Sequence, residues 1–397
     1  MAATDAPDGP PPLTFGPAEA DELVRRFWTA LGCDLRSITV PPLPAGGPAA
    51  EADMVRTLGF VAVLAAAGAA QEPSPLDKLV PAKLPAGIRP AKGLPPDVIA
   101  VLGTRGDKVD CFCFRPDGRL LALSGPDKGL RVWDLTGLKL TALTRLPDSV
   151  VCLAFSPDGK LLAVGDERGT VRVYDKAETK AAAPRATFAA HKYGPVWAVA
   201  FAPDGKMLAS GGRDKAVRVW DVSKAKGPAA ATLDGHEDGV RGVAFAPDGK
   251  RLYSVGGDDG QLRTWDVAAA KAAGAVKAGG RLNGVAVSAD GKHVATAGAK
   301  GAAKVWALKG GTPTSPTSLE ADGRAVLSVG FAPGGSEVAG LVNHSPTEDR
   351  VLVWGADGKK AHELRYDSHL TAAGFVADAR HLVVVAEGPA YLVRLPR

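Results

Sequence analysis

The chain has 397 residues, of which 46% are hydrophobic and 23% charged, so it can bury a sizeable core, and wholesale disorder is excluded. Its 48 glycines and 31 prolines, beside only 6% aromatic residues, are typical of many short strands joined by tight turns. The net charge of +5 is diffuse, and the four cysteines lack C-x-x-C spacing, which excludes a disulfide-dense or zinc-ribbon scaffold.

The N-terminal part begins with residues 1–53, which are rich in Pro, Ala and Gly and form no core of their own. Residues 54–70 then follow the order of a signal peptide, with Arg56, an apolar run and small residues suited to cleavage. The apolar run is shorter than the ~20 residues that a membrane-spanning helix needs. We therefore expect Met54 to be the true start and residues 1–53 to be a doubtful or disordered extension.

On this hypothesis the mature protein begins near Gln71 and is exported by a bacterium to the periplasm or the outside. The alternative is an apolar helix within a genuine N-terminal region of a cytoplasmic protein. Residues 71–95 are rich in proline, which predicts an extended linker.

From residue 97 onward the chain repeats one unit, seen most clearly at residues 233–266. This copy opens with Gly235-His236 and closes with Trp265-Asp266, and its alternating apolar runs between turns predict three antiparallel strands. A Phe-x-Pro-Asp-Gly turn, intact or degenerate, ends the first run of every copy. The seven anchor residues are Phe114, Phe155, Phe201, Phe245, Val287, Phe331 and Phe375, at spacings of 41, 46, 44, 42, 44 and 44 residues.

This pattern resembles the WD40 repeat family, in which repeats of ~40–45 residues with Gly-His and Trp-Asp marks build four-stranded blades. The likeness is most specific in the third and fourth copies and weakens in the last three, which lack both marks. It implies an all-β, seven-bladed β-propeller over residues 96–397. Exported propellers of the TolB or YVTN kind share the Phe-x-Pro-Asp-Gly turn and are the structural alternative.

The first run of each copy alternates bulky residues with small ones, which predicts the crowded innermost strand of a blade. Cys111, Cys113 and Cys152 occupy small positions and are expected to be buried space-fillers. The last copy ends at residues 391–395 without a fourth strand. We predict that residues 97–104 supply it and so join the two ends of the ring.

The third and fourth copies carry a repeated set of polar residues, namely His191, Ser210, Asp214 and Trp220, and His236, Ser254, Asp259 and Trp265. A Ser-His-Asp set is typical of hydrolases, yet this one occurs twice and has no G-x-S-x-G elbow. The resemblance implies a buried hydrogen-bond chain from Trp through Ser and His to Asp, which is a structural role. The first copy lacks the His, and the second has Arg168 and Tyr174 in place of Asp and Trp, so we expect incomplete networks there.

The resemblance also implies partner binding on the face where the inner strands begin, and at the residue before each turn Asp. Trp and Arg dominate interface energetics, so Trp197 is the candidate anchor; the alternative is that it packs into the connection between blades. The candidate partner-binding residues are Trp197, Arg241, Asn283, Arg213, Asp258, Asp110 and Tyr193.

We therefore predict a monomeric, non-catalytic scaffold that binds a protein partner, with no cofactor, no metal, no nucleic acid and no membrane span. The histidines are scattered, no glycine-rich phosphate loop precedes a helix, and the basic residues are spread over the sequence. A propeller enzyme using its central channel is the functional alternative, against which the small, apolar inner-strand positions argue. We expect residues 309–318 to be a flexible connection between blades.

Overall fold

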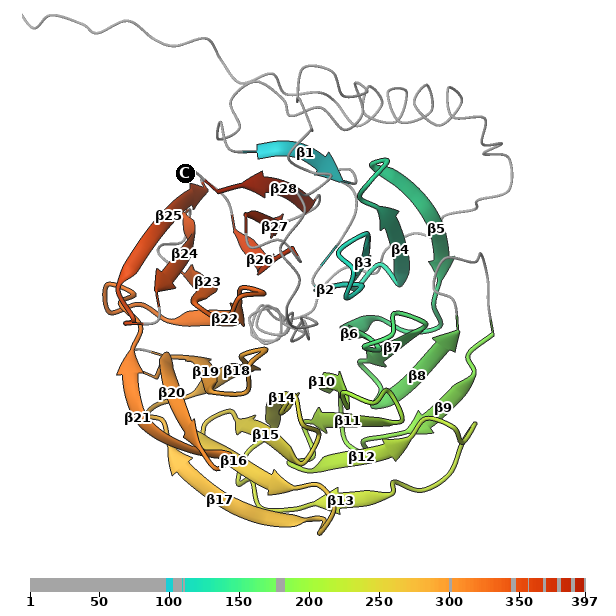
Figure 1. The fold of residues 1–397 in the computed structure, drawn as a ribbon. Coiled ribbons are helices and arrows are strands. Elements are labelled where there is room, and N and C mark those ends of the chain that lie inside the picture. The colour runs from blue at the N-terminus through green and yellow to red at the C-terminus, as the bar shows by residue number, and fades with distance from the viewer. Residues whose placement is uncertain are drawn as a thin grey trace, which may run out of the picture. The chain divides into compact units, whose positions relative to one another are not determined.

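A computed structural model describes residues 98–102, 109, 111–175, 183–299, 302–343, 348–355, 357–366, 369–376, 380–386 and 390–395. All regular elements in these residues are β-strands, which form seven antiparallel sheets of four strands arranged in a ring (Figure 1). The predicted all-β, seven-bladed propeller is thus confirmed. Residues 1–53, 54–70 and 71–95 lie outside the described residues, so the extension, the cleaved segment and the linker stay predictions.

Each sheet is one blade, and the first four blades follow the chain in order from the inner to the outer strand. Blade one comprises β2 (Cys111–Phe114), β3 (Leu120–Ser124), β4 (Gly129–Asp134) and β5 (Lys139–Arg145). Blade two comprises β6 (Val150–Phe155), β7 (Leu161–Asp166), β8 (Thr170–Asp175) and β9 (Ala186–Ala189). Blade three comprises β10 (Val196–Phe201), β11 (Met207–Gly212), β12 (Val217–Asp221) and β13 (Ala231–Leu233). Blade four comprises β14 (Val240–Phe245), β15 (Arg251–Gly256), β16 (Gln261–Asp266) and β17 (Lys271–Lys277).

The remaining blades continue this order, except that the last one needs a strand from the start of the described chain. Blade five comprises β18 (Leu282–Val287), β19 (His293–Gly298), β20 (Lys304–Lys309) and β21 (Thr312–Ser318). Blade six comprises β22 (Val326–Phe331), β23 (Glu337–Asn343), β24 (Asp349–Gly355) and β25 (Lys360–Tyr366). Blade seven comprises β26 (Leu370–Phe375), β27 (His381–Ala386), β28 (Ala390–Arg394) and β1 (Val98–Leu102).

Strand β1 closes the ring as the outer strand of blade seven. It pairs antiparallel with β28, with Ala100 opposite Leu392 and Leu102 opposite Ala390, and the two strands lie side by side in Figure 1. Ala100 and Leu102 are fully buried in the core shared by blades seven and one. The predicted closure by residues 97–104 is confirmed for residues 98–102, because the two ends of the chain now share one sheet.

Among the described residues, the hydrophobic core consists of seven large clusters between neighbouring blades and a small eighth one, formed by Val151 and Trp197. In one of the large clusters, Ala198 and Ala200 of β10 belong to the same cluster as Val243 and Phe245 of β14. The small positions predicted for the inner strands therefore accept the bulky side of the next blade. Close-packed interiors of this kind are sensitive to a change of a single methyl group.

Glycine at residue 242 shows how tight this packing becomes. A Cβ there would lie 3.0 Å from the backbone nitrogen of Val285 and 3.1 Å from its Cγ1, whereas the nearest atom to a Cβ at Gly284 is 3.9 Å away. Blades four and five thus approach each other so closely at residue 242 that a side chain there would have to displace its neighbours. The equivalent position of blade five has ordinary space.

The three cysteines of the described chain, Cys111, Cys113 and Cys152, are buried, as the sequence predicts. The Cys152 thiol lies 3.4 Å from the carbonyl oxygen of Val196, between blades two and three. Burial raises the pKa of both Cys113 and Cys152 well above the ordinary value. Both side chains are neutral space-fillers.

The prediction of a flexible connection at residues 309–318 is wrong. Strand β21 (Thr312–Ser318) pairs with β20 along its length, from Lys304 opposite Ser318 to Lys309 opposite Thr312. Gly310 and Gly311, with φ of 58° and 79°, make the intervening turn. The two prolines of this segment are tolerated because β21 is an outer strand with one unpaired edge.

Candidate partner-binding face

One end of blades three to five carries most of the candidate residues. The connections from an outer strand to the next inner strand meet there with the turns between the second and third strands. Arg213 donates its backbone N–H to Pro195 at 3.3 Å, and Gly257 donates to Gly239 at 2.9 Å. We call residues 191–197, 213–216, 234–241, 257–260 and 279–283 the connection face. The Phe-x-Pro-Asp-Gly turns lie at the opposite end of the same strands, here the Pro-Asp-Gly face.

Blade four contains the complete polar network that the sequence predicts. His236 Nδ1 lies 2.7 Å from Asp259 Oδ2, and His236 Nε2 lies 2.7 Å from Ser254 Oγ. Trp265 donates its indole N–H to the same Ser254 oxygen at 2.7 Å. The chain of bonds closes without conflict when Nδ1 carries the imidazole proton and the serine donates to Nε2. It joins the connection before β14 to β15 and β16.

Blade three has the same network with an added arginine. His191 Nδ1 lies 2.6 Å from Asp214 Oδ1, Nε2 lies 3.0 Å from Ser210 Oγ, and Trp220 donates to that oxygen at 2.9 Å. Arg218 donates to Asp214 Oδ2 at 2.8 Å. Burial alone would raise the pKa of Asp214, but its hydrogen bonds and charge interactions with His191 and Arg218 lower the value to about 2.

These two sets have the residue types of a hydrolase but not its accessibility. Ser210 and Ser254 are fully buried, and each serine oxygen accepts an indole N–H. A nucleophile must reach its substrate, and a serine that is sealed between strands cannot do so. The geometry therefore fits the predicted structural role.

Other blades show what happens when a member of the network is replaced. In blade one, Leu123 stands at the serine position and the buried indole N–H of Trp133 has no acceptor within the described chain. In blade five, Thr296 supplies the hydroxyl, and Trp306 donates to it at 3.3 Å. The sequence comparison did not single out Thr296, although it lies nine residues after the anchor, as Ser210 and Ser254 do.

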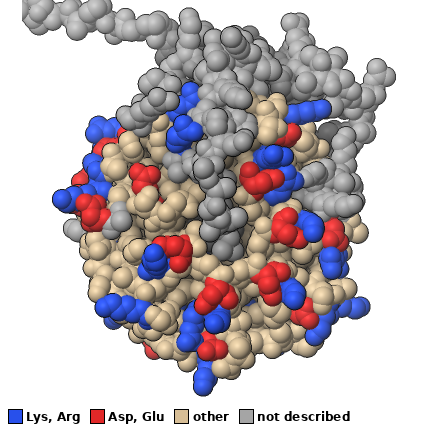
Figure 2. Space-filling model, viewed as in Figure 1, with Lys and Arg blue, Asp and Glu red and all other residues tan. Residues whose placement is uncertain are grey.

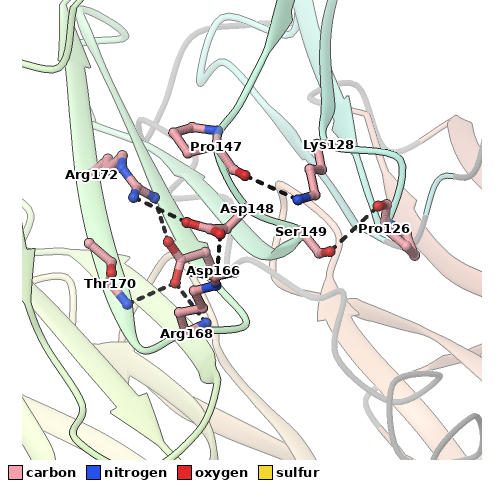
Figure 3. Close-up of polar contacts among 9 residues, drawn as sticks. All are labelled: Pro126, Lys128, Pro147, Asp148, Ser149, Asp166, Arg168, Thr170 and Arg172. Atoms are coloured by element: carbon pink, nitrogen blue, oxygen red, sulfur yellow. Dashed lines mark hydrogen bonds and ion pairs between the residues drawn. The ribbon is translucent and has the colours of Figure 1, made fainter. Parts of the chain in front are cut away.

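Blade two replaces the imidazole network with an ionic one, shown in Figure 3. Asp166, which is fully buried, accepts the backbone N–H groups of Arg168 and Thr170 at 2.9 and 2.8 Å and pairs with the guanidinium of Arg172. Asp148 accepts from both arginines, with Arg168 Nε at 2.9 Å. The prediction of an incomplete network in blade two is confirmed. Asp166, two residues before Arg168, accepts the backbone N–H groups of this turn instead.

Trp197, the candidate anchor, is packed rather than protruding. It is 6% exposed, and a Cβ on Gly239 would lie only 2.1 Å from its ring, so the indole rests directly on the glycine backbone of the next blade. The guanidinium carbon of Arg241 lies 4.6 Å from the centre of the ring, which is a cation–π contact. Trp197 and Arg241 thus form one stacked pair across blades three and four.

Arg241 is buried to the same extent as Trp197, and its Nε and Nη1 atoms have no hydrogen-bond partner in the described part of the chain. Burial is the main cause that lowers the pKa of Arg241, to about 10; the charge of Arg281 adds to it, while Asp238 and Asp258 oppose it. Arg241 therefore stays positively charged at neutral pH. Sequence reasoning did not identify Arg281 and Asp238, because neither lies at a position that the repeat pattern marks.

The remaining candidates differ in exposure. Tyr193 is 76% exposed, and Arg213 is exposed beside it, since a Cβ on Gly194 would lie 2.9 Å from Arg213 Cδ. Asp258 is exposed and lies 3.9 Å from Arg281. Asn283 is buried and donates to the carbonyl oxygen of Val326 at 3.1 Å. Asp110 lies outside the described residues.

The surface carries charges of both signs. Figure 2 shows Lys and Arg interspersed with Asp and Glu around the visible face, without one field of a single sign. Among the described residues, no three His, Cys, Asp or Glu side chains form a group that could hold a metal ion. The same residues include no helix that is long and apolar enough to cross a membrane.

Comparison with known proteins agrees with the repeat structure. The family model "WD domain, G-beta repeat" matches residues 97–134, 141–175, 182–221 and 227–266. These four segments span β1 to β16, apart from short gaps, and end with the third strand of blade four. No curated protein matches the chain.

Proposed function

We propose that this chain, a seven-bladed propeller of the WD40 repeat family, is a non-catalytic scaffold that binds a protein partner on its connection face. WD40 propellers are typical protein-interaction scaffolds and generally lack catalytic activity. The polar sets that resemble a hydrolase are sealed inside blades three and four. The surface is therefore the part of the molecule that is left for function.

The observation that carries the proposal is that Tyr193 and Arg213 are both exposed on the connection face, which also contains the buried pair of Trp197 and Arg241. Tyr193 and Leu143 are the large hydrophobic residues that stand exposed in the described chain, and Tyr193 is the more exposed. Tyr and Arg are enriched among the residues that contribute most to binding, particularly where rigid neighbours hold them in place. Trp197 and Arg241 form a buried cation–π pair within the same connection face.

The proposal is tested by capturing proteins from the native cell on the immobilised full chain. The wild type is compared with a Tyr193→Ala/Arg213→Ala variant, and with a Lys160→Ala/Lys206→Ala control on the Pro-Asp-Gly face, where both lysines are exposed. The proposal expects a protein that the wild type and the control retain and that the connection-face variant loses. A partner that all three retain equally, or that only the lysine variant loses, would place the binding surface elsewhere.

We also propose that the protein is exported and monomeric, as the sequence analysis predicts. Export concerns the N-terminal residues, which lie outside the described part of the chain. Sequencing the N-terminus of protein purified from its native cell tests export: a start near Gln71 supports it, and an intact Met1 in the cytoplasm contradicts it.

A further inference from the structure

Arg241 has the features of a binding group that lacks its ligand. Its guanidinium carbon lies over the ring of Trp197, 4.6 Å from the ring centre. A cation–π contact uses the charge of a guanidinium and leaves its N–H groups available for hydrogen bonds. Those N–H groups are the part of the side chain that recognises a planar oxyanion.

The donors of Arg241 are not satisfied within the fold. Nε and Nη1 are buried and have no acceptor in the part of the chain that the structure describes. Only 6% of the residue is exposed, so its Nε and Nη1 atoms have little hydration, and a ligand reaches them only when the side chains around them move. Leaving a charged group desolvated and unpaired is costly, so a fold retains one where a ligand completes it.

The acidic neighbours do not fill this role. Asp238 Oδ2 accepts the backbone N–H of Asp258 at 2.8 Å, and Asp258 Oδ1 lies 3.9 Å from Arg281 Nε. Arg281 Nε is itself buried without a hydrogen-bond acceptor in the described chain. The cluster therefore contains more N–H donors than it has acceptors for.

We propose that Arg241, held by Trp197 and assisted by Arg281, binds a carboxylate of the protein partner at the connection face. A carboxylate supplies two coplanar acceptors and a single negative charge. A phosphate would bring a second charge towards Asp238 and Asp258, which favours the carboxylate. The proposal rests on the proposed function, because it specifies the chemistry of the partner for the same face.

The test needs no identified partner. The full chain, labelled with ¹⁵N, is titrated with acetyl-Gly-Glu-Gly-amide, its Gln counterpart, its phosphoserine counterpart, and acetyl-Gly-Gly with a free C-terminus. The readouts are the Nε–H resonance of Arg241 and the indole N–H resonance of Trp197, assigned with Arg241→Lys and Trp197→Phe. The Glu peptide and the free C-terminus separate the two sources of carboxylate.

The proposal expects saturable shifts of both resonances with at least one carboxylate probe and none with the Gln peptide. Arg241→Lys should weaken the binding that the Trp197 resonance reports by about tenfold, the equivalent of one charge-assisted hydrogen bond. Arg119→Lys is the matched control, because Arg119 is exposed on the Pro-Asp-Gly face, and it should leave binding unchanged.

Equal shifts with Glu and Gln, or binding of the phosphoserine peptide alone, would overturn the proposal. The comparison of Glu with Gln uses only the wild type, so it stands even if a variant fails to fold. If the probes fail while the connection-face capture succeeds, the carboxylate proposal alone is wrong. If the probes bind while the capture maps elsewhere, the proposed function is wrong.

Discussion

At the residue scale, the blades differ in whether the buried indole N–H of their tryptophan has a hydrogen-bond acceptor, and in which group accepts it. Trp265 donates its indole N–H to Ser254 at 2.7 Å, and Trp306 donates to Thr296 at 3.3 Å. Trp354 instead donates to the carbonyl oxygen of Glu320 at 2.7 Å. The blades are therefore equivalent in backbone but differ in the strength of their polar support.

This difference predicts unequal costs for removing the same hydroxyl. Ser254→Ala leaves both the indole N–H of Trp265 and the Nε2 atom of His236 without a partner, so we expect a loss of about 2–4 kcal/mol in the free energy of unfolding. Thr296→Val removes one long bond to Trp306 and the bond to Ala302, with a smaller loss of about 1–2 kcal/mol. Urea denaturation measures both. Equal losses would show that the His-containing network adds nothing.

The ion pair of Asp214 predicts a pH dependence. Its folded pKa of about 2 lies below the ordinary value of 3.8, so its contribution to stability is present above pH 4 and lost as the pH falls through 2. We expect Asp214→Asn to cost about 2 kcal/mol at pH 7 and progressively less towards pH 2. Asp322→Asn, at an exposed position, is the control. A cost for Asp214→Asn that is constant over this range would contradict the assignment.

The two His networks are predicted by the resemblance to the WD40 family, and the recurrence of their four members in two copies argues against a catalytic site. The sequence does not predict the network of blade two, since Asp166 occupies the position of Gly212 and Gly256 rather than that of the turn acid. Arg172, which aligns with Arg218, is the one residue that indicates a missing acidic partner. Repeat patterns therefore reveal polar networks that several blades share and miss a different network that occurs in a single blade.

At the scale of elements, the alternation of small and bulky residues along the inner strands determines how closely the blades approach. This alternation is readable from the sequence because seven copies show it. The individual distances between blades cannot be read from the sequence, because they depend on how each pair of neighbouring blades packs. Gly242 and Gly284 occupy the same position of the repeat, yet only Gly242 touches the next inner strand closely.

Adding a methyl group at these two glycines should therefore have different effects. Gly242→Ala places a Cβ about as close to Val285 as atoms can come, so we expect a loss of about 1–3 kcal/mol from overpacking. Gly284→Ala meets only ordinary contacts and should be neutral or stabilising by up to about 1 kcal/mol. Thermal and urea unfolding of the two variants check the difference. Similar losses would contradict the inter-blade packing described for residue 242.

The closing strand can be tested with two leucines on outer strands. Leu102 of β1 is fully buried between blades seven and one, whereas Leu143 of β5 is 48% exposed. Leu102→Asp should cost more than about 3 kcal/mol because it buries a charge, while Leu143→Asp should stay within about 0.5 kcal/mol of the wild type. Deletion of residues 96–104 should also lower the melting temperature sharply. If Leu102→Asp behaves like Leu143→Asp, β1 does not close the ring.

At the scale of the whole molecule, the number of blades, their order and the closure of the ring follow from the sequence. The partner-binding face is predicted only in outline. The repeat pattern points to Trp197 and Arg241, but their burial and mutual stacking depend on Gly239 and on the approach of blade four to blade three. Tyr193 and Arg213 stand outside this stack and carry the exposed part of the face.

The central claim is that the connection face binds the partner and the Pro-Asp-Gly face does not. Hydrogen–deuterium exchange of the full chain, alone and with the captured partner, tests it most directly. We expect added protection at residues 191–197, 213–216, 234–241 and 257–260. The turns at 115–119, 157–160, 203–206 and 247–250 should be unchanged. Protection confined to those turns, or spread evenly over both ends of the blades, would contradict the claim.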